Sequence, residues 1–151
     1  MALDYLPSHK GLNYNLTYLG TPNLLLLYQL IIMALEQSID FKNESSLLYD
    51  LLKSKNDDIF NSKTQFKSWT INDVLYHLHV WNNAAFLSLT NEKKFSKFMK
   101  DFFTAIKSGH SARSHEKELS NNISGQNLLM EWKKDYEKIS EEFLNADPKK
   151  R

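Results

Sequence analysis

The stretch from Lys67 to Ala85, KSWTINDVLYHLHVWNNAA, holds the clearest helix start in this chain of 151 residues. Thr70 is a favoured N-cap residue, and Asp73, three residues later, can complete a capping box with it. Asp73 also places negative charge in the first turn, where the helix dipole favours it. We therefore expect a helix that begins at Thr70 and runs to about Leu89.

A single histidine is predicted to face the apolar side of this helix. On a helical wheel, four apolar residues cluster within about 40° of arc: Val74, Leu78, Trp81 and Ala85. His77 lies about 60° from the centre of that cluster and points largely inward, whereas His79 falls on the outward side. Such a histidine is either a core-edge residue hydrogen-bonded to a neighbour or a metal ligand. One histidine does not make a site, since a catalytic zinc usually has three protein ligands.

Composition predicts one all-α domain with a sizeable core. The chain is 42% hydrophobic and contains 9 Phe, 7 Tyr and 3 Trp, but Gly (4) and Pro (3) are few. Its net charge is +1 without a basic stripe, so we expect neither nucleic acid nor membrane as a partner. The absence of cysteine excludes disulfides, thiolate nucleophiles and zinc–thiolate sites.

The N-terminal part allows several interpretations. Residues 1–23 show no helical period, and the apolar run Leu24–Leu35 is too short for a membrane span, which needs about 20 residues. The run could be a signal-peptide core or, as we prefer, a buried helical segment. Met33 opens a better helical pattern, so residues 1–32 are either a poorly ordered extension, a short apolar helix or a wrongly assigned start.

Three further helical segments follow from periodicity. The first would run from Leu24 or Met33 to Lys53, with an apolar face of Leu35, Ile39, Leu48, Leu51 and Leu52. The second carries a stripe that we expect to be core: Phe95, Phe98, Met99, Phe102, Phe103 and Ile106. The third would begin near Ser124, end at Asp147-Pro148, and bury Leu128, Trp132, Tyr136, Ile139 and Phe143.

The segment between the last two of these helices lacks a clear pattern. Residues 108–123 are polar, charged and aperiodic, which predicts a surface loop or a marginal helix. His110 and His115 are five residues apart and do not share a helix face, so we expect both to be solvated.

Around His77 the sequence resembles the DinB-like superfamily, specifically the metal-binding domain of mycothiol-dependent maleylpyruvate isomerases. The motif of that domain is roughly W-[ST]-x-x-D-x-x-x-H-L, and it stands here as WTINDVLYHL, from Trp69 to Leu78. The segments Ile39–Leu51, Asn91–Phe98 and Leu128–Trp132 also resemble the family, as does the closing Asp147-Pro148. The resemblance covers about residues 34–151.

The resemblance implies a four-helix bundle that holds a divalent metal, often zinc or nickel, with His77 as the first ligand. It also implies a low-molecular-weight thiol, which the metal would activate as a thiolate, and a small-molecule substrate. The implied activity is a thiol-dependent isomerase or transferase in the cytoplasm.

The remaining ligands of this family come from a last helix that carries Glu or His followed by His one turn later. The sequence contains no such pair. We therefore expect residues 33–151 to form a bundle incomplete at the C-terminus, with three long helices and a shorter one, and to bind metal weakly or incompletely.

Two consequences would follow from an incomplete bundle. The chain could be a non-catalytic helical interaction domain, or a gene fragment with no activity of its own. A core face left uncovered would be filled by Leu24–Met33 or by pairing of two copies into a homodimer.

Overall fold

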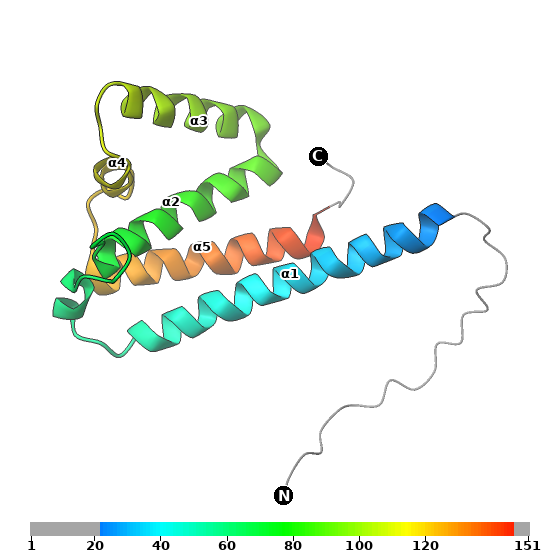
Figure 1. The fold of residues 1–151 in the computed structure, drawn as a ribbon, viewed down its shortest axis with the longest axis horizontal. Helices are drawn as coiled ribbons and strands as arrows, with labels where there is room; N and C mark the ends of the chain where they lie inside the picture. Colours follow the sequence, from blue (N-terminus) through cyan, green and yellow to red (C-terminus); the bar gives the residue numbers. More distant parts are fainter. Residues whose placement is uncertain (1–21, 147–151) are drawn as a thin grey trace, which may run out of the picture.

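The structure is a computed structural model that describes the backbone of residues 22–146, and this part of the chain is all-α (Figure 1). Its elements are α1 (Pro22–Leu52), the 3-10 helix η1 (Asp57–Asn61), α2 (Ile71–Thr90), α3 (Glu92–Lys107), α4 (Ala112–Leu119) and α5 (Gly125–Asn145). An isolated bridge between Lys63 and Thr70 is the β-type pairing found there, and the described residues form no strand. The all-α prediction is confirmed.

The helices are arranged around α5. Helix α5 packs against both α1 and α2, whereas α1 and α2 do not pack on each other. Figure 1 shows α1 and α5 side by side, with α4 and α3 placed on the far side of α2. α3 and α4 both pack against α2 and against each other. The three long helices and the shorter α3 match the prediction, and α4 is the segment for which a loop or a marginal helix was expected.

Helix α1 runs without a break from Pro22 and includes the segment Leu24–Met33. This segment therefore extends α1 along its own axis, beyond the end of α5 (Figure 1). None of the described helices is both long enough and apolar enough to cross a membrane. Residues 1–21, at the start of the expected extension, lie outside the described part.

The predicted apolar face of α1 is partly wrong. Ile39 and Leu51 are 45% and 61% exposed, whereas Leu52 is buried, Leu48 is half-buried, and Leu35 has no described side chain. The side of α1 that faces the core also buries two serines, Ser38 and Ser45. The reason is the position of α5, which packs against α1: the ring of Phe41 meets that of Phe143 edge-on at 5.6 Å on the side of α1 that turns inward.

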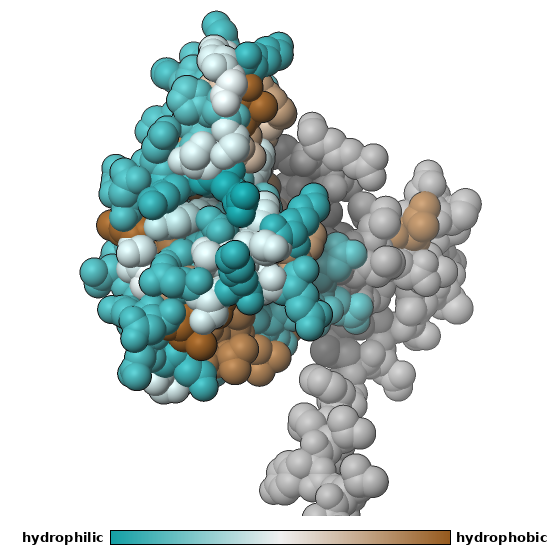
Figure 2. All heavy atoms as spheres, turned by 60° about the vertical axis from the view of Figure 1, so that its left-hand side comes forward, coloured by the Kyte–Doolittle hydropathy of each residue, from teal (hydrophilic) through white to brown (hydrophobic). Residues whose placement is uncertain are grey.

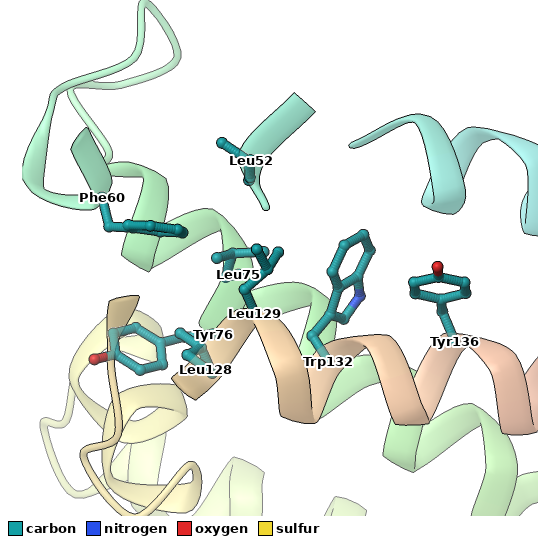
Figure 3. Close-up of a cluster of buried hydrophobic side chains, with 8 residues drawn as sticks. All are labelled: Leu52, Phe60, Leu75, Tyr76, Leu128, Leu129, Trp132 and Tyr136. Carbon is teal, nitrogen blue, oxygen red and sulfur yellow. The ribbon is translucent and has the colours of Figure 1, made fainter. Parts of the chain in front are cut away.

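The main core lies where α5 meets α2, η1 and the end of α1 (Figure 3). Its buried members are Leu52, Phe60, Leu75, Tyr76, Leu128, Leu129, Trp132 and Tyr136. Four of the five residues predicted for the inner face of α5 are buried, and Phe143 is half-buried. The apolar side of α5 is thus enclosed by its neighbours, and the uncovered core face that we expected is not found on this helix.

The start of α2 is confirmed. Thr70 is the N-cap, its side-chain oxygen accepts from the Asp73 backbone N–H at 3.1 Å, and the Asp73 carboxylate accepts from the Thr70 backbone N–H at 2.8 Å. Two backbone donors at the helix end are satisfied reciprocally. Helix α2 ends at Thr90, one residue after the predicted end.

Replacement of Thr70 by alanine is expected to lower the free energy of unfolding by about 1 kcal/mol, because one capping oxygen is lost. Urea denaturation followed by circular dichroism measures this change. Thr70→Ser keeps the hydroxyl and is the matched control, expected within about 0.5 kcal/mol of wild type. Equal stability of the alanine and serine variants would show that this cap does not stabilise α2.

The buried face of α2 differs from the one predicted. The buried apolar residues are Leu75, Tyr76, Val80 and Ala84, whereas the predicted cluster of Val74, Leu78, Trp81 and Ala85 is half-buried. Helix α2 has neighbours on two sides, α5 on one and α3 with α4 on the other. The buried residues of α2 are therefore determined by the positions of these neighbouring helices, and not by the predicted apolar cluster alone. Burial raises the pKa of the Tyr76 phenol, with a further contribution from the Asp73 charge.

The aromatic stripe of α3 is only partly core. Phe102 is buried, Phe103 is 52% exposed, and Phe95, Phe98, Met99 and Ile106 are half-buried. Helix α3 packs against α2 and α4 along one edge, so it covers less surface than a helix inside a bundle. Figure 2 shows a face of the molecule on which hydrophilic residues predominate and hydrophobic residues form small separate areas.

Candidate functional site

His77 on α2 is hydrogen-bonded to a carboxylate on α4. Its Nδ1 atom lies 2.9 Å from Oε1 of Glu116, and its side chain is 45% exposed. The prediction that this side chain points largely inward is therefore only half correct. One edge of the ring is held against α4, and the rest is open to the surroundings.

Glu116 is the most deeply buried charged group of this region, at 1% exposure. The same Oε1 atom accepts a second hydrogen bond, from the indole Nε1 of Trp81 at 2.9 Å. Its other oxygen, Oε2, is buried and has no hydrogen-bond partner among the described residues. A carboxylate oxygen left in this state costs free energy, so packing alone does not account for the residue.

Local sequence explains how Glu116 is brought to His77. Ser111 caps α4 by accepting from the Ser114 backbone N–H at 3.1 Å. The helix ends at Leu119, and Asn121 and Asn122 follow with φ of 54° and 57°, a conformation that asparagine tolerates better than most residues. The short helix between these two signals lies on α2 and directs Glu116 at it.

Two aromatic rings contact the imidazole of His77. The ring of Trp69 lies 5.6 Å from that of His77, and the ring of Trp81 lies 6.0 Å from it, measured between centroids. The Arg113 guanidinium lies over the Trp69 ring at 5.9 Å and 3.7 Å from the Asp73 carboxylate. The carboxylate, the two indoles and the backbone of α2 therefore restrict the orientation of the imidazole.

His79 was predicted to lie on the outward side of α2, and this prediction is wrong. Its side chain is 17% exposed and makes an ion-pair contact with Asp135 of α5. Asn83 also donates to Asp135, at 2.8 Å. Because α5 covers this side of α2, His79 lies in a contact between two helices, and His77 is the more accessible of the two histidines.

The other two described histidines lie around α4. His110 is exposed, as expected, and its Nδ1 contacts the Ala105 carbonyl at 3.1 Å. The His115 side chain is only 17% exposed, because its ring lies 5.4 Å from that of Phe102. The expectation of a solvated loop is therefore wrong for His115, which α4 turns toward α3.

Around His77 the described residues offer one imidazole for a metal and not a whole set of ligands. Among residues 22–146, no group of three or more His, Cys, Asp or Glu side chains is placed to hold a metal ion. Glu116, the acid that contacts His77, is held through Oε1 by His77 and Trp81, and its Oε2 is buried. His77 can act as a ligand here, and its partners would have to come from elsewhere.

Comparison with known proteins identifies one family. The model of the family described as mycothiol maleylpyruvate isomerase N-terminal domain matches residues 41–151, which is most of the chain. No curated protein and no solved structure matches the chain. The match includes α2, α4 and α5, and with them His77 and Glu116.

Proposed function

The chain belongs to the family of mycothiol maleylpyruvate isomerase N-terminal domains, and from this premise we propose that it binds a divalent metal ion, zinc or nickel, with His77 as one ligand. The observation that carries the proposal is the hydrogen bond of 2.9 Å between His77 Nδ1 and Glu116 Oε1. Histidines that ligate metals almost always donate their second ring N–H to a carboxylate, a carbonyl or water.

The accessibility of His77 supports the same proposal. Its side chain is 45% exposed although Glu116 beside it is 1% exposed, so the ring is anchored at one edge and reachable at the other. His79 has a carboxylate partner too, but α5 covers it. Of the described histidines, His77 is the one that has both a carboxylate partner and an accessible side chain.

The residues present fit one position of a metal site. His77 would hold the ion, and we propose that further ligands come from outside residues 22–146, from another segment or from a second copy in a homodimer. Zinc sites that carry out chemistry usually have three protein ligands. On its own, a single imidazole binds weakly because it lacks chelation, so we expect weak metal binding unless those further ligands are present.

We propose thiol-dependent isomerase or transferase chemistry on a small-molecule substrate for the completed site. A bound divalent metal would lower the pKa of a low-molecular-weight thiol. In this chain, Trp69 and Trp81 would contact the His77 ring and Glu116 would hold its Nδ1 proton. Such a thiol would be kept reduced in the cytoplasm, which we propose as the location.

A second candidate function is a non-catalytic helical interaction domain. It is favoured by Leu47 and Leu51, which lie one turn apart on α1 and are 70% and 61% exposed. Exposed apolar side chains of this size are suited to contact with a partner helix. In this alternative His77 is a core-edge residue, and metal binding would be absent.

Titration calorimetry of the metal-free chain with zinc and with nickel tests the proposal. We expect binding by wild type and its loss in His77→Ala, because the imidazole is the ligand. His110→Ala removes an exposed histidine and is the matched control, expected to bind as wild type does. Equal binding by wild type and His77→Ala, or no binding by wild type, would contradict the metal-binding function and favour the interaction domain.

A further inference from the structure

We propose that Glu116 is a positioning residue that holds His77 in the tautomer protonated at Nδ1, so that Nε2 is the atom that binds a metal. The part concerning the metal rests on the proposed function. The part concerning the tautomer is a property of the metal-free chain and can be tested separately.

The assignment of the proton follows from the chemistry of the pair. An ionised carboxylate only accepts hydrogen bonds, so a neutral imidazole 2.9 Å from Glu116 Oε1 donates to it through Nδ1–H. In neutral imidazole the other nitrogen then carries a free lone pair. The described residues give Nε2 no hydrogen-bond partner, and the side chain is 45% exposed. Nε2 is therefore the atom available to a ligand.

The carboxylate is itself fixed in place. Trp81 donates to the same Oε1 atom at 2.9 Å, and Glu116 is 1% exposed. The carboxylate would have to leave a buried environment and break two hydrogen bonds to turn away. The ring that it orients also contacts Trp69 and Trp81. Preorganisation of this kind lowers the entropy cost of binding a ligand at Nε2.

Stability does not favour a carboxylate at this position. Oε2 of Glu116 is buried without a hydrogen-bond partner among the described residues. A buried charge with one unpaired oxygen is costly, and apolar replacement of buried ionic groups is often neutral or stabilising. The role that we assign to Glu116 is to orient His77.

The test uses nitrogen-15 NMR of the histidine side chains in the metal-free chain, at about pH 8, where an ordinary histidine is neutral. In wild type we expect His77 to be protonated at Nδ1. Glu116→Ala should lose this preference, whereas Glu116→Gln should keep it, because the amide oxygen accepts the same hydrogen bond. Glu118→Ala removes an exposed carboxylate of the same helix and is the matched control.

Zinc titration of the same variants gives the second readout. Loss of an outer-shell partner typically costs roughly 10–100-fold in metal affinity, so we expect this loss in Glu116→Ala and a smaller one in Glu116→Gln. Glu118→Ala should bind as wild type does. Circular dichroism checks that α4 and the rest of the chain remain folded in each variant.

Different results would overturn the positioning role of Glu116 and the metal-binding function. A folded Glu116→Ala variant in which His77 stays protonated at Nδ1 would overturn the positioning role. Loss of the tautomer in Glu116→Ala would support it. If zinc does not bind to wild type although Glu116 sets the tautomer, the proposed function is wrong and the tautomer assignment stands.

Discussion

Replacement of Trp132 by alanine is expected to lower the free energy of unfolding by about 3–5 kcal/mol. Trp132 is 1% exposed and lies in the core between α5 and its neighbours (Figure 3). Its ring lies 5.0 Å from that of Tyr136. Truncation removes this contact and leaves a large cavity, because the surrounding helices relax only in part.

Urea denaturation followed by circular dichroism measures the effect without relying on tryptophan fluorescence. Trp132→Phe should cost less than the alanine variant, because it keeps a ring and removes the indole N–H, which has no partner among the described residues. Asn127→Ala, at an exposed position of the same helix, should stay within about 0.5 kcal/mol of wild type. A Trp132→Ala variant as stable as Asn127→Ala would contradict the placement of the core.

Replacement of Gly125 by alanine is expected to lower the free energy of unfolding by about 1–3 kcal/mol. Gly125 begins α5 with φ of 60°, where a side chain is strained. An added Cβ would lie 2.5 Å from Oδ1 of Asp57. That oxygen accepts from the Gln126 backbone N–H at 3.0 Å, so moving it away breaks a hydrogen bond at the helix start. The Gly125 N–H also donates to Asn72, at 2.8 Å.

A double-mutant cycle separates the contact with Asp57 from the backbone strain. Asp57→Ala alone loses the hydrogen bond to the Gln126 N–H. In the double variant the added methyl group of residue 125 no longer meets the Asp57 carboxylate, so the close contact of the Gly125→Ala variant is relieved. The cost of the double variant should be less than the sum of the two single costs, because the residues are in contact. Denaturation midpoints of the four proteins give the result. Strict additivity would show that Asp57 moves aside freely and that strain alone accounts for the loss.

The start of α2 could be predicted because its signal is local: Thr70 and Asp73 lie within one turn of it. Ser124 is the N-cap of α5, as predicted, but its side chain makes no cap hydrogen bond, and the first two N–H groups of α5 donate to Asn72 and Asp57. The hydrophobic period of α5 correctly predicted its buried side, because that side faces one continuous core.

The faces of α1, α2 and α3 could not be predicted in the same way, because they depend on which helix packs against which. Ile39 and Leu51 continue the apolar pattern of α1 but turn away from α5. His79 looked exposed on a wheel that contained α2 alone, and α5 covers it. Hydrophobic periodicity shows on which side of a helix the apolar residues cluster. Which residues become buried also depends on the helices that pack against it.

The sequence predicted one of the two residues of the candidate site, His77, and not the other, Glu116. His77 was singled out by its place after a capped helix start and by the family motif. Glu116 was missed, because it lies between His115 and Lys117 in a charged segment that reads as surface. The signal that could have indicated α4 is Ser111, an N-cap residue, followed by a turn of Asn121 and Asn122. A contact across 39 residues leaves no local trace.

The most direct test of the account is a zinc titration of the wild-type chain followed by nitrogen-15 NMR of its histidine side chains. We predict that the Nε2 signal of His77 shifts first, while its Nδ1 stays protonated against Glu116. The other four histidines of the chain serve as internal references in the same spectrum. Zinc-dependent shifts at those histidines with none at His77 would contradict the claim that His77 is the metal ligand.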